Sequence, residues 1–139
     1  IPKSWRLYYN MIDWQAKEQN RDFFEQVKKM IRIRRQHPEI FEYFPDDHRN
    51  SNICKVSTDR NGMLQAYARF RSGKAVLVVP NNGKFDETFR ITIPIAEAKL
   101  PRGKTFQVTD LMSGKTLGQA QPTFSAAIPT GALGVFLIQ

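Results

Sequence analysis

The sequence has few of the residues from which metal and redox sites are built. Its 139 residues include one cysteine, Cys54, and two histidines, His37 and His48. One cysteine excludes an internal disulfide framework and a multi-cysteine zinc site, and the two histidines argue against a closed structural zinc site. We therefore expect no metal and no cofactor.

Long apolar runs and targeting signals are also missing. No apolar run approaches the roughly 20 residues that cross a bilayer, no signal peptide is recognisable, and the chain opens with Ile1 rather than Met. We expect a processed product or a piece of a longer chain, with no membrane partner. The compartment stays open, because a single reduced cysteine suits both the bacterial cytoplasm and export.

The motifs of common catalytic sites are absent as well. There is no glycine-rich phosphate loop and no G-x-S-x-G sequence. Cys54 lies in an apolar strand pattern and is interpreted as a buried, inert thiol. A nucleophilic cysteine needs a base, but His37 is placed at the end of a helix and His48 in a polar loop. The sequence therefore predicts no nucleophilic catalysis.

The acidic residues do not form a predicted site either. Asp46 and Asp47 could hold a cation such as calcium, but two adjacent loop acids are usually just solvated. Glycoside chemistry needs two carboxylates aimed at one bond. The remaining acids fall in the first turns of a helix, where the helix dipole favours them, or at turns and edges of strands.

The charge balance is strongly basic. Lysine and arginine number 21 against 13 acids, which gives a formal net charge of +8. Such a field can attract nucleic acid, but the basic residues are spread through the sequence rather than clustered between aromatic rings. With 41% apolar and 24% charged residues, the chain is typical of a globular protein whose basic residues solvate exposed faces. No nucleic-acid partner is expected.

The chain divides near residue 50, with a helical pattern before it. Residues 1–19 are aromatic and without a clean period, whereas residues 20–37 predict an amphipathic helix with Asn20 as its N-cap and Pro38 as its stop. One arc of this helix, the helix stripe, consists of Phe23, Phe24, Val27, Met30 and Ile31. A membrane-surface helix is the alternative, but we favour a stripe that packs on the rest of the chain or on a second copy.

After a loop over residues 38–50, short apolar runs alternate with turn signals. The predicted strands are 53–57, 63–70, 75–79, 88–93, 105–109, 115–117, 123–128 and 133–138. The run 75–79 is continuously apolar, as in a strand buried on both faces. No helix separates the strands, so the sheets should be antiparallel. The predicted fold is mainly β: an antiparallel β-sandwich of about eight strands preceded by an amphipathic helix.

The order of several motifs is similar to one known family. The motifs are Asn10-Met11-Ile12-Asp13-Trp14, Asn20-Arg21-Asp22-Phe23-Phe24, the run from Met30 to His37-Pro38, Ala66–Phe70, Ala75–Asn81, Asp110–Lys115 and the closing stretch from Ile128 to Leu137. In this order they resemble the C-terminal end of the α-amylase superfamily of glycoside hydrolases. The sequence around Tyr9-Asn10 and Ile12–Trp14 resembles the debranching branch of that family, which includes the pullulanases and isoamylases. Pro80 departs from the pattern, since an apolar residue usually precedes Asn81.

This resemblance implies that residues 1–50 end a catalytic barrel and that residues 51–139 form its C-terminal sandwich. The catalytic acids of the family lie on earlier barrel strands, which this sequence does not contain. The implied function is a non-catalytic domain that stabilises the barrel of an enzyme acting on starch, glycogen or pullulan, with the missing barrel as its partner. In this interpretation the helix stripe is the interface with that barrel or with a second copy. The alternative is a carbohydrate-binding module that stacks α-glucan on exposed rings. The candidate rings are Trp5, Tyr8, Tyr9, Trp14 and Tyr43, although we favour core packing or lost barrel contacts as the reason for their presence.

Overall fold

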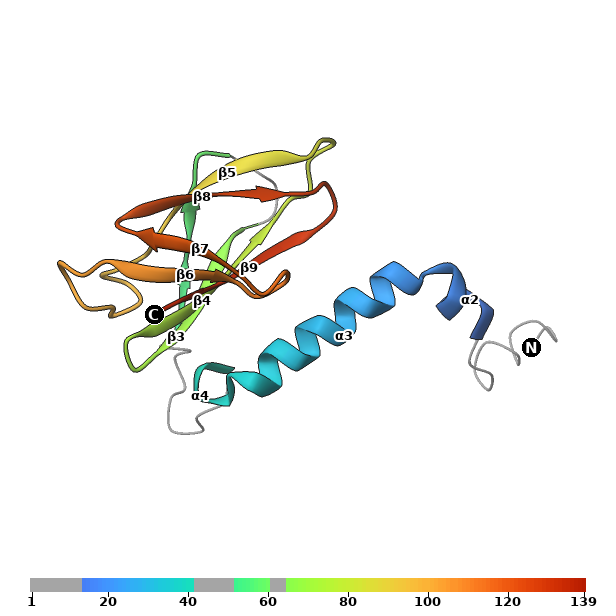
Figure 1. Cartoon of the computed structure of the whole chain (residues 1–139), viewed down its shortest axis with the longest axis horizontal. Coiled ribbons are helices and arrows are strands. Elements are labelled where there is room, and N and C mark those ends of the chain that lie inside the picture. Colours follow the sequence, from blue (N-terminus) through green and yellow to red (C-terminus); the bar gives the residue numbers. More distant parts are fainter. Residues whose placement is uncertain (1–13, 42–51, 61–64) are drawn as a thin grey trace, which may run out of the picture. The chain divides into compact units, whose positions relative to one another are not determined.

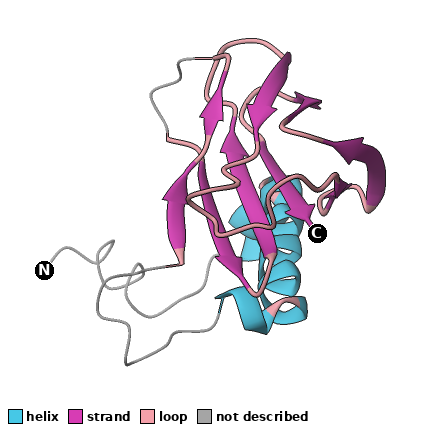
Figure 2. Ribbon diagram, turned by 90° about the vertical axis from the view of Figure 1, so that its left-hand side faces the viewer, coloured by secondary structure: helices cyan, strands magenta, loops and turns pink. Residues whose placement is uncertain are grey.

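The structure is a computed structural model that describes residues 14–41, 52–60 and 65–139. It divides the chain into two compact units, Ile1–Gln36 and His37–Gln139. In the described residues, the first unit is helical and the second holds all the strands (Figures 1 and 2).

Two helices make up the described part of the first unit. They are α2, Trp14–Gln19, and α3, Arg21–Gln36. Asn20 joins them: its carbonyl accepts the hydrogen bond from the Phe24 N–H that begins α3. Its side-chain Nδ2 donates to the Ala16 carbonyl at 2.8 Å. Asn20 therefore occupies the N-cap position of α3, as predicted, but its side chain closes the end of α2 instead of capping α3.

The length of α3 agrees with its sequence signals. Asp22 lies in the first turn, and Arg34 and Arg35 lie in the last turn, where each charge complements the helix dipole. The helix ends at Gln36, two residues before Pro38, as expected from the steric effect of proline on the preceding residue.

The second unit is an antiparallel β-sandwich. Its described strands are β1 Ile53–Lys55, β2 Ser57–Thr58, β3 Tyr67–Arg71, β4 Lys74–Pro80, β5 Glu87–Thr92, β6 Phe106–Asp110, β7 Lys115–Ala120, β8 Thr123–Ile128 and β9 Leu133–Ile138. One sheet has the order β1-β3-β4-β9-β6-β7, and the other has the order β2-β5-β8. Figure 1 labels β3 to β9 among these strands. The mainly β sandwich predicted from the sequence is confirmed.

The core lies between the inner faces of the two sheets. β4 is buried on both of its faces, as its continuous apolar run predicts. Its inner face contributes Ala75, Leu77 and Val79 to the core cluster. Phe136 of β9 is 1% exposed, and its ring meets the ring of Phe124 edge-on with centroids 5.2 Å apart. This contact joins one sheet to the other, since Phe124 belongs to β8.

A short helix packs on the sandwich. α4, Pro38–Phe41, contacts β3 and β4, and its Ile40 is completely buried. The Asn52 side chain, just before β1, donates a 3.2 Å hydrogen bond to the Ile40 carbonyl. Pro38 stops α3 but is well suited to the first turn of a new helix, where no N–H is required. The loop expected over residues 38–50 is therefore helical at its start, and its remainder lies outside the described residues.

Several strand boundaries differ from the sequence prediction. The single strand expected over residues 53–57 is two strands, because the chain leaves one sheet at Val56 and joins the other at Ser57. Because of this division, the described residues form nine strands, whereas about eight were expected. The expected Lys115–Leu117 strand continues to Ala120 through a bulge opposite Val108 and Thr109. The irregular stretch expected over residues 1–19 is helical from Trp14 onward.

Replacing Gly134 with alanine tests how tightly the two sheets meet. A Cβ atom at Gly134 would lie 2.6 Å from Ile128 Cδ1 and 2.7 Å from Phe136 Cε2. We expect Gly134→Ala to lower the free energy of unfolding by about 1–3 kcal/mol, as overpacked cores do. Urea unfolding followed by circular dichroism measures this change. Adding Ile128→Val should recover part of the loss, whereas an unchanged midpoint for Gly134→Ala would contradict the tight packing.

Candidate functional site

The aromatic site expected from the sequence is only partly described. Trp5, Tyr8, Tyr9 and Tyr43 lie outside the described residues. Trp14 is described as the first residue of α2, and its side chain is 63% exposed. The Lys17 ammonium lies 5.4 Å from the Trp14 ring centroid, within the range of a cation–π contact. Whether the expected rings form one surface stays a prediction.

Lysine side chains also cover one ring of the helix stripe. Two ammonium groups lie near the ring of Phe24, with Lys17 Nζ 4.8 Å and Lys28 Nζ 5.3 Å from its centroid. Lys28 also donates a 3.1 Å hydrogen bond to Glu25 Oε1. This hydrogen bond, with the positive charge of Lys28 itself, lowers the pKa of the Glu25 carboxyl.

The helix stripe is largely exposed. Phe23, Phe24, Val27 and Ile31 are all exposed, and Met30 is half-buried. Phe23 reaches 68% exposure and Ile31 reaches 52%. A contiguous apolar stripe of this kind is typical of an interaction surface. What covers the stripe stays a prediction.

The sandwich carries a cleft of about 570 Å³, beside β2, β5 and the end of β4. Its floor includes the buried side chains of Val79 and Phe89. Polar side chains surround this floor, namely Lys55, Ser57, Thr58, Arg60, Gln65, Asn82 and Glu87. Positively charged donors, a carboxylate acceptor and neutral polar groups therefore line the cleft. This lining suits a hydroxyl-rich ligand better than an apolar one.

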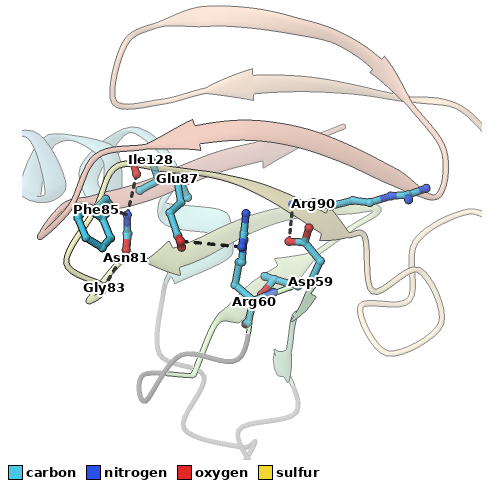
Figure 3. A network of polar contacts seen from close by, with 9 residues as sticks. Asp59, Arg60, Asn81, Gly83, Phe85, Glu87, Arg90 and Ile128 are labelled. Carbon is cyan, nitrogen blue, oxygen red and sulfur yellow. Dashed lines mark hydrogen bonds and ion pairs between the residues drawn. The ribbon is translucent and has the colours of Figure 1, made fainter.

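Two pairs of residues make polar contacts on this side of the sandwich (Figure 3). Arg60 Nη1 lies 3.9 Å from Glu87 Oε1, which is a loose and partly exposed ion pair. The Arg90 N–H donates to Asp59 Oδ1 at 2.8 Å, while the Asp59 N–H donates to the Arg90 carbonyl at 3.1 Å. Asp59 thus ends the pairing of β2 with β5. The carboxylate of Asp59 therefore has a structural role, as the acceptor for a backbone N–H of β5.

Asn81 is the buried polar residue next to the cleft, with 3% exposure. Its Nδ2 donates to the Ile128 carbonyl at 2.8 Å and to the Phe85 carbonyl at 3.0 Å, and its Oδ1 accepts from the Gly83 N–H at 3.0 Å (Figure 3). Its backbone exchanges hydrogen bonds with Gly131 and Ala132. Asn81 therefore shapes the turn after β4 and ties it to the β8–β9 connection. Asn81-Asn82-Gly83 is a turn signal in the sequence, and this signal indicates none of the contacts with the β8–β9 connection.

The cleft contains little catalytic chemistry. Among the described residues that line it, Glu87 is the only carboxylate, whereas glycoside hydrolysis uses two. The described part of the chain contains no cluster of three or more histidine, cysteine or acidic side chains that could hold a metal ion. None of the described helices is long and apolar enough to cross a membrane.

Other predicted residues are accounted for individually. His37 accepts hydrogen bonds at its carbonyl from the N–H groups of Ile40 and Phe41, and its Nδ1 lies 3.8 Å from Glu39 Oε1. It therefore begins α4 in addition to following α3. Asp46, Asp47 and His48 lie outside the described residues.

Cys54 is half-buried beside the core. Burial raises the pKa of its thiol, and the negative charge of Glu97 raises it further. The thiol is therefore protonated at neutral pH. The sequence predicts a buried thiol, whereas Cys54 is only half-buried, and its inertness stays a prediction. Because the folded-state pKa exceeds the unfolded one, Cys54 favours folding below the unfolded pKa, and this contribution is lost as the pH rises through the folded value.

We expect Cys54 in the folded chain to react with a thiol reagent such as iodoacetamide several-fold more slowly at pH 8 than in the urea-unfolded chain. The rate in the folded chain should still be climbing above pH 9, because the thiolate forms late. Mass spectrometry of timed samples measures both rates. Equal rates in the folded and unfolded chains would contradict this account of the thiol.

Comparison with known proteins gives a low level of similarity. No family model matches the chain, and no curated protein matches it. The solved structure of α-galactosidase I from Mortierella vinacea is similar with a TM-score of 0.47 and 17% identity, over 58% of this chain and 21% of that one. A GH27 β-L-arabinopyranosidase from Geobacillus stearothermophilus, in complex with arabinose, is similar with a TM-score of 0.47 and 8% identity, over 63% of this chain and 20% of that one.

The chain therefore spans about one fifth of the length of these two solved structures. Both are glycosidases by name, and neither is named as an α-amylase. Similarity at this level does not establish a shared family or a shared activity.

Proposed function

We propose that this chain is the non-catalytic C-terminal region of a glycoside hydrolase. In this proposal α3 is the last helix of a catalytic barrel and the sandwich is the domain that follows it. The observation that carries the proposal is the order of parts. An amphipathic helix ends at Gln36, directly before the His37-Pro38 motif, and the antiparallel sandwich follows. This is the arrangement implied by the resemblance in sequence.

Individual motifs also coincide with suitable elements. The Asp110–Lys115 motif is the turn between β6 and β7, where Asp110 Oδ1 accepts a 2.8 Å hydrogen bond from the Met112 N–H. The Ala75–Asn81 motif is the buried centre of β4 and the residue after it. Each motif thus has a structural role in the sandwich: Asp110 stabilises a turn, and the apolar residues of β4 belong to the core. These roles support the proposal.

The chemistry of the described residues supports a non-catalytic role. Barrel active sites are assembled from the loops of many strands at one face of the barrel, and one helix with a following sandwich does not supply that face. The exposed Phe23 and Ile31 of the helix stripe are what a helix presents when its partner is a larger apolar surface. We propose that the barrel of the intact enzyme covers the stripe.

The finer part of the proposal is the kind of enzyme. The α-amylase superfamily, the debranching branch and α-glucans as the substrate come from the sequence motifs alone. A second candidate function is binding of α-glucan by the chain itself. The exposed ring of Trp14 favours this candidate, because the C–H faces of sugars stack on accessible aromatic rings.

The test is titration of the full chain with maltooligosaccharides and pullulan, by calorimetry or by NMR shifts, alongside an assay of glucan hydrolysis. We expect neither hydrolysis nor saturable binding, because the role proposed for the chain is structural. Hydrolysis that follows this polypeptide through purification would overturn the non-catalytic proposal. Saturable binding without hydrolysis would replace it with the second candidate.

A matched pair of variants makes the second outcome specific. If binding occurs through α2, Trp14→Ala should abolish it, whereas Phe85→Ala should leave it unchanged. Phe85 is a suitable control because its ring is 73% exposed but lies in the sandwich. Equal losses in both variants would exclude a specific site at Trp14.

A further inference from the structure

The three-stranded sheet has one long unpaired edge. In the described residues, β8 pairs with β5 on one side and with no strand on the other. β8 is six residues long and lies between two prolines, Pro122 and Pro129. Because neither proline has an N–H, the pairing-competent edge is limited to Thr123–Ile128.

A hydrogen bond at the start of β8 identifies the backbone groups that point toward β5. The Ile93 N–H donates to the Pro122 carbonyl at 2.8 Å, next to the pairs Thr92–Thr123 and Ile91–Phe124. Hydrogen-bonded pairs alternate along an antiparallel ladder. Phe124, Ala126 and Ile128 therefore direct their backbone groups toward β5.

The intervening residues direct theirs outward. Thr123, Ser125 and Ala127 each present an N–H and a carbonyl to the open edge, and Ser125 and Ala127 are exposed. Arg90, the partner of Ser125, agrees with this assignment of outward groups. Its carbonyl accepts from the Asp59 N–H on the β2 side and not from β8.

The remaining sheet edges carry features that discourage pairing. β2 has only two residues, and β1 has three and ends with Lys55. β7 starts with Lys115 and contains a bulge beside Gly118, whose φ is +110°. β8, with the sequence Thr-Phe-Ser-Ala-Ala-Ile, has no charge and no bulge. It is the edge best suited to accept another strand.

We propose that β8 pairs with β8 of a second copy of this chain. A twofold axis at Ser125 places Ser125 opposite itself and Thr123 opposite Ala127 of the second copy, which joins all the outward groups in hydrogen-bonded pairs. The two three-stranded sheets then become one continuous antiparallel sheet. The occupant is a second copy because this edge is self-complementary: its outward positions are symmetric about Ser125 and its side chains there are small and uncharged.

The net charge of the chain does not prevent this pairing. Within the joined sheet, the nearest like charges across the axis are the two copies of Arg90, since Arg90 is paired with Ser125. Three strand spacings separate them, about 14 Å, which exceeds the Debye length of about 8 Å at physiological salt. The dimer should be weak, because only one short edge is buried in each copy, and it is independent of the function proposed above.

Analytical ultracentrifugation of the full chain tests this proposal. We expect the average mass to rise from 16.1 kDa toward twice that value as the concentration approaches the millimolar range. Ser125→Pro removes an outward N–H without removing a bond to β5, and should weaken association by about tenfold or more. Ser125→Ala keeps the N–H and should associate as the parent does.

NMR locates the surface at which the copies associate, and a second variant tests the same edge. The amide shifts of Thr123, Ser125 and Ala127 should move with concentration, and Ala127→Lys should suppress both the shifts and the association if Ser125→Pro does not fold. A chain that stays monomeric throughout would overturn the proposal. So would association that survives both variants, or association that is lost in Ile31→Ser of the helix stripe instead.

Discussion

Phe136→Ala should lower the free energy of unfolding by about 3–5 kcal/mol, the range for a buried aromatic ring replaced by alanine. The ring is 1% exposed and lies in β9, between β4 and β6 of the larger sheet. It also contacts Phe124 of the smaller sheet edge-on. The substitution therefore opens a cavity between the sheets and removes an aromatic pair. Since small domains are stable by only about 5–15 kcal/mol, this variant should be marginally folded.

Urea unfolding followed by far-ultraviolet circular dichroism measures the effect of Phe136→Ala. Tryptophan fluorescence is unsuitable, because Trp14 belongs to the first unit and not to the sandwich and Trp5 lies outside the described residues. Phe85→Ala is the matched control, since Phe85 is 73% exposed and its loss should change stability by less than about 0.5 kcal/mol. Similar losses in the two variants would show that the ring of Phe136 is not central to the core.

Asn81→Ala should lower the free energy of unfolding by about 3 kcal/mol, although it removes no apolar group. The substitution leaves the carbonyls of Ile128 and Phe85 without their donor and the Gly83 N–H without its acceptor. Each buried polar group left unsatisfied costs about 1–3 kcal/mol, and water entering from the cleft should offset part of the total. The same urea titration measures this change.

Asn81→Asp tests the donor role of the Asn81 side chain separately from its acceptor role. The aspartate retains an oxygen for the Gly83 N–H but presents a second oxygen to two carbonyls, so at pH 7 it should be at least as harmful as alanine. Protonation provides a donor, which raises the folded-state pKa of the new carboxyl. The stability of Asn81→Asp should therefore improve as the pH falls below neutral. If Asn81→Asp has full stability at pH 7, the hydrogen bonds from Nδ2 are not important.

Local patterns in the sequence predict most of the fold. β8 and β9 have the bounds expected from their alternation and their flanking prolines and glycines, and α3 begins and ends within one residue of the range expected for it, residues 20–37. The two-sided burial of β4 follows from its unbroken apolar run. These signals are reliable because each depends on residues that are neighbours in sequence.

The differences arise where distant residues decide the structure. The change of sheets at Val56 depends on the bond from the Val56 N–H to the Ala66 carbonyl and on the pairing of β2 with β5, which no local pattern specifies. Asn81 has the appearance of a simple turn residue, since its main partner, the Ile128 carbonyl, is 47 positions away. The cleft was not predicted for the same reason: its lining residues come from four separate stretches of the chain.

The position of β9 has a consequence for the order in which the sandwich is made. β9 lies in the middle of the larger sheet, paired with β4 on one side and with β6 on the other. During synthesis, β4 and β6 must wait for Leu133–Ile138 to leave the ribosome before their edges are filled. Partners so far apart in sequence make closure slow, and the unfilled edges are open to other chains in the interval. The nascent sandwich is therefore the form of this protein that depends most on protection from aggregation.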